Sequence, residues 1–194
     1  MFLSEQEQQR REKRTELKKM GVNPYPSEEF KINVTSDDIK KNYEKAKTDY
    51  KDISIAGRLM SIRKQGSAAF AELQDAHGRI QIYLRRDDLC PGEDKTTYNT
   101  IFKKMVDLGD IVGIKGFVFT TKVGEITIHA TEFTLLTKTL KPLPVAKTDA
   151  DGNVHDAFTD PEQRYRQRYV DLVVNPHVKD AFLKRSQMVK EMRT

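Results

Sequence analysis

One aromatic side chain stands where the sequence predicts a solvent-facing position. The stretch SAAFAELQDAHGRIQIYLRR, residues 67–86, alternates like two β-strands joined by a tight turn. Leu73 belongs to the apolar face of the first strand, whereas Phe70 shares the opposite face with Glu72. An outward ring on a strand can stack on an unpaired nucleic-acid base. A single exposed phenylalanine is also common on protein surfaces, so alternation by itself leaves both interpretations open.

Few other residues are of types that suggest disulfide formation or metal binding. Cys90 is the only cysteine, so we expect neither an internal disulfide nor a cysteine-based metal centre, and a reducing cytoplasm fits best. The segment DADGN, residues 149–153, resembles part of a calcium loop but lacks the other ligands and the closing glutamate, which favours a polar turn. The sequence therefore predicts no metal-binding residue in this chain.

Charge is distributed unevenly along the 194 residues. The net charge is +5, but residues 52–137 contain 11 Lys/Arg and 11 Asp/Glu, so the excess lies in the flanks. A uniformly basic nucleic-acid surface is not supported, whereas a short charged site is compatible with these numbers. No apolar run approaches the roughly 20 residues of a membrane span, and the N-terminus lacks the apolar core of a secretion signal, so no membrane partner is expected.

The first 51 residues predict two helices joined by an extended strap. Ser4 and Glu7 form a capping-box pattern before the first helix, and Gly21 is a natural end. Residues 22–30, VNPYPSEEF, contain two prolines and are expected to be extended; residues 34–50 predict the second helix. The first helix has a basic stripe that fits either a solvated face or phosphate contacts. It consists of Arg10, Arg14 and Lys18.

A period of two then replaces the helical period. Strands are predicted at 52–64, 67–75 and 79–86, a helix at 95–109, and a hairpin over 110–138 that turns near Val123 and Gly124. This order is that of an OB-fold, a five-stranded barrel with a helix between strands 3 and 4. The expected fold class is α+β, mostly β, with helices added at both ends.

Four regions follow from this pattern. We expect an N-terminal extension over 1–51, the barrel over 52–137, a linker over 138–159 and a further helical region over 160–194. In the last region Asp160 caps and Pro161 begins a helix that continues to Leu172, and a final helix starts at 177.

Four stretches carry a resemblance to a known family. They are RREKRTELKKMGVNPYP, AGRLMSIRKQGSAAFAELQDAHGRIQIYL, LGDIVGIKGFVFTTKVGEITIHATEFTLLTKTLKPLP and RYRQRYVDL. Together they resemble class II lysyl-tRNA synthetases. Aspartyl- and asparaginyl-tRNA synthetases have a similar barrel, but RYRQRYVDL and the strap favour the lysyl family. A stand-alone OB-fold module for single-stranded nucleic acid is the alternative; it accounts for the barrel but not for RYRQRYVDL.

The resemblance implies a parent enzyme that ligates lysine to its tRNA through a lysyl-adenylate, using ATP and Mg²⁺. Residues 160–194 would open a truncated class II catalytic domain, so this fragment is expected to bind tRNA and to be inactive by itself, with no cofactor of its own. The implied partner is a lysine-accepting tRNA with a uracil-rich anticodon. The parent would be a homodimer that associates mainly through the missing core, which leaves a monomer open for the fragment.

The resemblance also implies four nucleic-acid-binding residues. Phe70 matches the family's stacking aromatic, Gln81 the glutamine that reads the Watson–Crick edge of uracil, and Arg63 the arginine that sandwiches the same base. Glu125 matches an acceptor for a flanking base. Without the resemblance these would be an exposed ring, a strand amide, a surface charge and a turn residue. His129 is interpreted as a partnered surface histidine, and Tyr83 and Arg79 are not assigned a role.

Overall fold

The computed structural model describes residues 3–144, 146–148, 154–155 and 157–193. These residues form two compact units, Met1–Pro142 and Leu143–Thr194. The segment DADGN, 149–153, for which a polar turn was predicted, lies outside the described residues. No helix among the described residues is long and apolar enough to cross a membrane.

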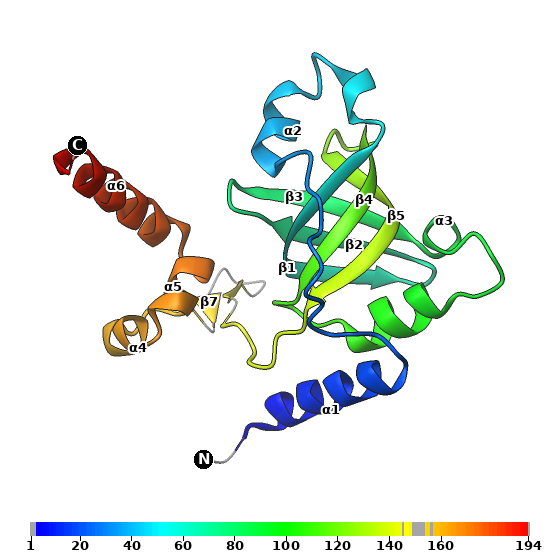
Figure 1. Ribbon diagram of the computed structural model, residues 1–194, viewed down its shortest axis with the longest axis horizontal. Coiled ribbons are helices and arrows are strands. Elements are labelled where there is room, and N and C mark those ends of the chain that lie inside the picture. Colours follow the sequence, from blue (N-terminus) through cyan, green and yellow to red (C-terminus); the bar gives the residue numbers. More distant parts are fainter. Residues whose placement is uncertain (1–2, 145, 149–153, 156, 194) are drawn as a thin grey trace. The chain divides into compact units, whose positions relative to one another are not determined.

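The first unit is built around a closed five-stranded barrel (Figure 1). Its strands are β1 Ile53–Gln65, β2 Ala68–Gln74, β3 Arg79–Arg85, β4 Ile111–Thr120 and β5 Ile126–Thr137. They pair in the order β1-β2-β3-β5-β4, antiparallel except for β3 with β5. The barrel predicted from the sequence is thereby confirmed.

Two helical segments connect β3 to β4. A short helix α3, Arg86–Leu89, directly follows β3, and η2, Thr97–Met105, lies where the connecting helix was predicted. η2 is wound as a π-helix and ends at Met105, four residues before the predicted stop at Gly109. Tyr98 and Phe102, on its apolar side, are almost completely buried against the barrel core.

Alternation decides which side chains fill the barrel. In β2 and β3 every second residue is buried, so that Leu73 and Ile82 are fully inside while Phe70 and Gln81 are only half-buried. Gly57 allows β1 to bend closely past β2, because a Cβ at this position would lie 2.6 Å from the carbonyl oxygen of Gln74.

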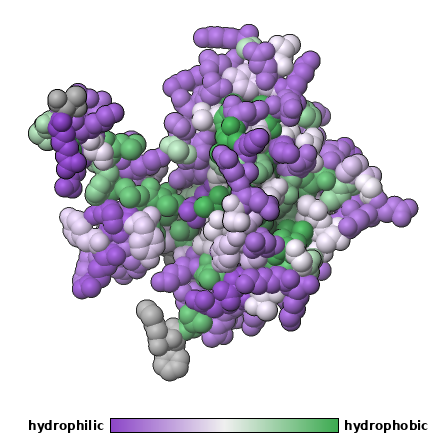
Figure 2. All heavy atoms as spheres, in the orientation of Figure 1, coloured by the Kyte–Doolittle hydropathy of each residue, from purple (hydrophilic) through white to green (hydrophobic). Residues whose placement is uncertain are grey.

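The N-terminal helix α1, Glu5–Lys19, begins with the predicted capping box between Ser4 and Glu7, and Gly21 follows it with φ +77°. Hydrophilic side chains cover it in the view of Figure 2. Its basic stripe is not uniformly solvated, however. Arg10 is 9% exposed and donates to the carbonyl oxygen of Thr139 at 3.3 Å, so it packs against the unit instead of facing solvent.

The strap runs from α1 across the barrel to α2, Ser36–Asn42 (Figure 1). The ring of Phe30 lies over Gly113, where a Cβ would come within 2.5 Å of it. Asn33 continues the contact, because it donates through its backbone N–H to the carbonyl oxygen of Ser54 at 3.0 Å and accepts at its side chain from the Ser54 N–H at 2.7 Å.

α2 is shorter than the predicted helix, and a separate turn of 3-10 helix, η1 Lys47–Tyr50, follows it. Two tyrosine hydroxyls are held by different partners. Tyr43 donates to the carbonyl oxygen of Val118 at 3.2 Å, and Tyr50 donates to the carboxylate of Asp38 at 2.9 Å. The chain changes direction between them so that both rings pack edge to face, 5.9 Å apart.

A buried charge cluster joins α1, the η2–β4 connection and the end of β5. Lys138, the first residue of the predicted linker, has a fully buried side chain, and its Nζ lies 2.5 Å from Asp107 and 2.8 Å from Asp110. Lys13 of α1 reaches Asp107 from the other side, also at 2.5 Å. Burial raises the pKa of Asp107, but hydrogen bonds from Lys13 and Lys138 outweigh it and lower the pKa.

The second unit contains β6 Lys147–Thr148, β7 Val154–His155, α4 Pro161–Arg166, α5 Arg168–Val174 and α6 Pro176–Met192. The single helix predicted from Pro161 to Leu172 is wrong, since the backbone leaves the helical region at Gln167. The break lets Arg164 and Arg168 both reach the buried carboxylate of Asp171, with Arg164 Nε at 3.0 Å.

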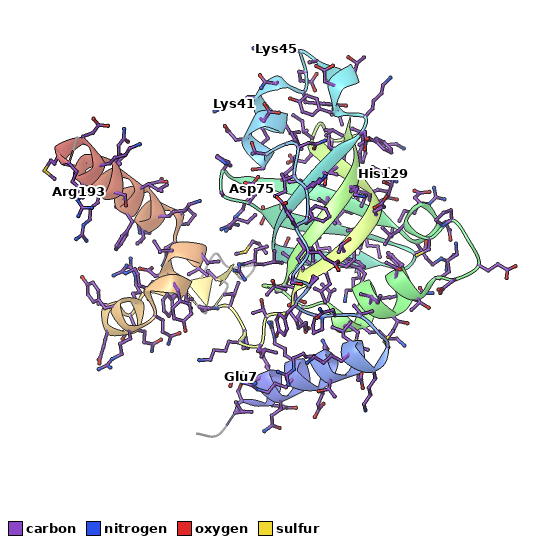
Figure 3. All side chains as sticks on the ribbon, in the orientation of Figure 1. Glu7, Lys41, Lys45, Asp75, His129 and Arg193 are labelled. Atoms are coloured by element: carbon purple, nitrogen blue, oxygen red, sulfur yellow. The ribbon has the colours of Figure 1, made fainter. Side chains whose placement is uncertain are left out.

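Asp75 fastens α2 to the turn between β2 and β3 (Figure 3). Its carboxylate accepts from the N–H and the hydroxyl of Ser36, both at 2.7 Å, and from the N–H groups of His77 and Gly78, both at 2.8 Å. Partial burial raises the pKa of this carboxyl, but these hydrogen bonds outweigh burial and lower the pKa below its ordinary value of 3.8.

We therefore expect Asp75→Asn to lower the free energy of unfolding at pH 7 by about 1–3 kcal/mol, because an amide cannot accept all four bonds. A lowered folded-state pKa stabilises the fold above the unfolded pKa and loses that effect as pH falls through the folded value. The difference between wild type and variant should thus shrink below about pH 4 in urea unfolding between pH 7 and pH 3. Asp37→Asn on the same helix is the control, and a pH-independent difference would contradict the assignment.

Candidate nucleic-acid interface

A row of side chains crosses the outer face of all five strands. The register places Arg63 of β1 opposite Phe70 of β2, Phe70 opposite Tyr83 of β3, Tyr83 beside His129 of β5, and His129 opposite Phe117 of β4. Since neighbouring strands put directly paired residues on the same face, the row forms one continuous surface. We call these five residues the outer row.

The aromatic members of the outer row touch one another. The ring centroids of Phe70 and Tyr83 are 5.0 Å apart, those of Tyr83 and His129 5.2 Å, and those of Phe117 and His129 4.7 Å in a stacked arrangement. Phe119, two residues after Phe117, completes the group, with its ring centroid 6.2 Å from that of Tyr83. The rings support one another at distances typical of aromatic pairs, so they form a preassembled apolar wall.

His129 has a polar partner as well as its ring neighbours. Its Nε2 lies 2.9 Å from the carboxylate of Asp88 in α3, on the side of the barrel that α3 covers (Figure 3). This contact agrees with the interpretation of His129 as a partnered surface histidine.

Gln81 lies in the adjacent cross-strand row, paired with Glu72 on one side and Thr127 on the other. Its Nε2 donates to the hydroxyl of Thr127 at 3.3 Å, and that hydroxyl donates to the backbone carbonyl of Glu125 at 3.2 Å. Thr127 is fully buried. The chain of two hydrogen bonds holds the Gln81 amide in place and connects it to the turn that carries Glu125.

Two adjoining hollows lie over these rows. The aromatic hollow has a volume of about 670 Å³, and the polar hollow about 150 Å³. Arg63, Phe70 and Gln81 line both hollows. The aromatic hollow is completed mainly by Tyr83, Phe119, Lys122, Val123 and His129. The polar hollow is completed mainly by Lys40, Glu72, Arg79 and Glu125.

The structure thus brings the four sequence-predicted residues to one surface. Arg63, Phe70 and Gln81 stand at the boundary of the two hollows, and exposed Glu125 lies in the polar one. Arg79 forms an ion pair with Glu72 at 3.2 Å, and its Nε donates a hydrogen bond to Oε1 of Gln74 at 2.8 Å. Within the described part of the chain, Arg63 takes part in no ion pair, so its guanidinium is available to a ligand.

Sequence reasoning missed part of the aromatic wall. The sequence assigns no role to Tyr83, and it does not single out Phe117 or Phe119 as site residues. The signal was present, because both phenylalanines alternate with Val118, which belongs to the inward set of β4. That they join Phe70 in one wall through Tyr83 and His129 could not be read from alternation, since it depends on the parallel pairing of β3 with β5.

This arrangement can bind a flat, unpaired base. The ring of Phe70 offers a stacking surface, a nearby amide can donate to and accept from a base edge, and a guanidinium can stack on the opposite side. Among the residues that the structure describes, no group of three or more His, Cys, Asp or Glu side chains could hold a metal ion.

Comparisons with known proteins agree with this geometry. Residues 53–136 match the family of OB-fold nucleic acid binding domains. The whole chain is similar to lysine–tRNA ligases: it is 56% identical over 191 residues to that of Christiangramia forsetii, 56% over 193 residues to that of Porphyromonas gingivalis, and 48% over 192 residues to that of Azobacteroides pseudotrichonymphae. These matches cover 98%, 99% and 99% of this chain.

The same matches cover 33%, 33% and 38% of the three relatives, so the chain spans about a third of the length of the curated proteins that it resembles. The predicted OB-fold and the predicted resemblance to lysyl-tRNA synthetases are both confirmed.

The two faces of β2 predict effects of different size on folding. Leu73→Ala should lower the free energy of unfolding by about 2–5 kcal/mol, because it removes a fully buried side chain from the barrel. Phe70→Ala should cost about 1 kcal/mol or less, since it removes a partly exposed ring and one aromatic contact. Urea unfolding of both variants tests this difference. Equal losses would mean that Phe70 contributes to the core.

Proposed function

We propose that this chain, which is homologous along nearly its whole length to lysine–tRNA ligases, is the part of such an enzyme that recognises the tRNA anticodon. The observation that supports this most directly is the Phe70 ring on the outer face of the barrel. It lies next to the anchored amide of Gln81 and the guanidinium of Arg63, which has no ion pair within the described part of the chain. Anticodon bases are unpaired and can be turned out onto a protein surface, where stacking and edge hydrogen bonds discriminate among them.

Each residue has a defined role in this proposal. Phe70 stacks on a uracil of the anticodon, and Arg63 covers the other face of the same base. Gln81 binds its Watson–Crick edge, where the amide supplies one donor and one acceptor. Glu125, across the polar hollow, accepts a hydrogen bond from a flanking base. The tRNA partner is the lysine-accepting one with a uracil-rich anticodon.

The activity of the whole protein is part of the same proposal. It would ligate lysine to tRNA in the cytoplasm, as a homodimer, with ATP and Mg²⁺ supplying the activation of lysine. We assign no residue of this chain to ATP or Mg²⁺. Similarity extends through both flanks of the barrel, so neither a stand-alone OB-fold module nor an aspartyl- or asparaginyl-type synthetase is favoured.

RNA titration tests the proposed reading of the anticodon. Phe70→Ala should weaken binding of an anticodon stem-loop with a UUU loop by about 1–3 kcal/mol, the usual value of one base–aromatic stack. Phe182→Ala, which removes an exposed phenylalanine from the second unit, is the matched control and should leave affinity unchanged. If both variants bind like wild type, Phe70 is not the stacking residue.

Gln81→Ala should act on discrimination more than on affinity. The wild type should prefer a UUU loop over the same stem-loop with the central uracil replaced by cytosine, and the variant should lose most of that preference, a change of about 1–3 kcal/mol. The measurement is the ratio of the two dissociation constants by fluorescence anisotropy. A uniform loss for both RNAs would show that Gln81 supports the site without reading the base.

A further inference from the structure

We infer that Lys40 of α2 binds a backbone phosphate of the RNA beside the bases held at Phe70 and Gln81, which makes the N-terminal extension part of the RNA-binding site. This inference rests on the proposed function and adds a contact from outside the barrel.

Position is the first support. Lys40 lines the polar hollow together with Arg63, Gln81 and Glu125, although it comes from a different part of the fold. The polar hollow shares Arg63, Phe70 and Gln81 with the aromatic hollow. A strand with one base in each hollow would pass Arg63, Phe70 and Gln81, and Lys40 lines the polar hollow with these residues.

The attachment of α2 to the barrel is the second support. Ser36, at the start of the helix, is held by two hydrogen bonds of 2.7 Å to Asp75, in the turn that joins β2 to β3. Ile39, next to Lys40 in the sequence, is fully buried in the core. The Lys40 backbone is thus fixed relative to the strands that carry Phe70 and Gln81, so its charge can contribute without ordering the helix on binding.

Charge is the third support. On α2 the neighbouring Lys41 is paired with Asp37 at 2.7 Å, and Lys47 of η1 is paired with Glu44 at 2.9 Å. Lys40 is exposed and has no ion pair among the residues that the structure describes. In the polar hollow Glu72 is already paired with Arg79. The cation at position 40 is therefore available to an anion brought by the ligand.

The chemistry of lysine favours a phosphate over a base. An ammonium group has three donors and no acceptor, and its compact charge suits a phosphate oxygen without a fixed geometry. Gln81 and Glu125 already provide the directional groups that distinguish base edges. Lys40 should therefore contribute affinity without sequence preference.

The experiment compares Lys40→Gln with Lys41→Gln in the full chain. Lys41 is on the same helix and is exposed, but it does not line either hollow. Binding of two stem-loops, with UUU and with CCC loops, is measured by fluorescence anisotropy from 50 to 200 mM KCl, and thermal unfolding confirms that both variants remain folded. Lys40→Arg is included because it keeps the charge.

For one single-strand phosphate contact the contribution to the association constant falls as about the −0.7 power of the molar salt concentration and vanishes near 1 M. Lys40→Gln should therefore weaken binding about eightfold at 50 mM and about threefold at 200 mM, reduce the salt slope by about 0.7, and do so equally for both loops. Lys41→Gln should have no such effect, and Lys40→Arg should bind like wild type.

Three results would overturn the inference. Lys40 is only a solvated residue if its variant binds like Lys41→Gln, and it contacts a base if the loss differs between the two loops. An unchanged salt slope would exclude a phosphate contact. Failure of the wild type to bind either stem-loop is a separate outcome, since it contradicts the proposed function itself.

Discussion

Closure of the barrel through β1 is the constraint on which the rest of the first unit depends. β1 pairs with β4 over Ile53–Arg58 and with β2 over Arg58–Gln65, so a single strand belongs to both edges of what would otherwise be an open sheet. The close approach to Gln74 that Gly57 permits and the register shift between Leu59 and Ser61 lie where the strand passes from one partner to the other. Once the barrel is closed, every strand has one inner and one outer face, and the alternation of the sequence decides which side chains occupy each.

The outer face acquires its chemistry from the order of the strands. The pairing order β2-β3-β5-β4 places Tyr83 and His129 between Phe70 and Phe117. The rings form a wall at one side of Gln81, and the ion pair of Arg79 with Glu72 lies at the other. A stacking surface next to a polar surface is suited to bases that are first unstacked from one another and then distinguished by their edges.

The N-terminal extension is held on the barrel by side chains that are buried or partly buried. Lys138 and Asp110 are completely buried, and together with Asp107 and Lys13 they join α1 to the ends of β4 and β5. Phe30 lies over Gly113, and Asp75 holds the start of α2. Such buried charges are costly when one partner is removed, so they specify where the extension docks. The result is an extension that supplies Lys40 to the site, although most of its basic residues lie elsewhere.

Local sequence determined much of this protein. The capping box at Ser4, the strands around Leu73 and Ile82, and the outward position of Phe70 were all readable, because they depend on side-chain periodicity and on hydrogen bonds within a few residues. The similarity of long motifs also indicated the family and four candidate site residues, whose roles remain predictions. Tertiary structure alone decided three other features. The burial of Arg10 and Lys138 depends on partners far away in the chain. The break at Gln167 accompanies the sharing of the Asp171 carboxylate by Arg164 and Arg168, which periodicity does not show. The meeting of Phe70, Tyr83, His129 and Phe117 depends on strand pairing, because alternation gives each residue its face but only the register of distant strands gives it its neighbours.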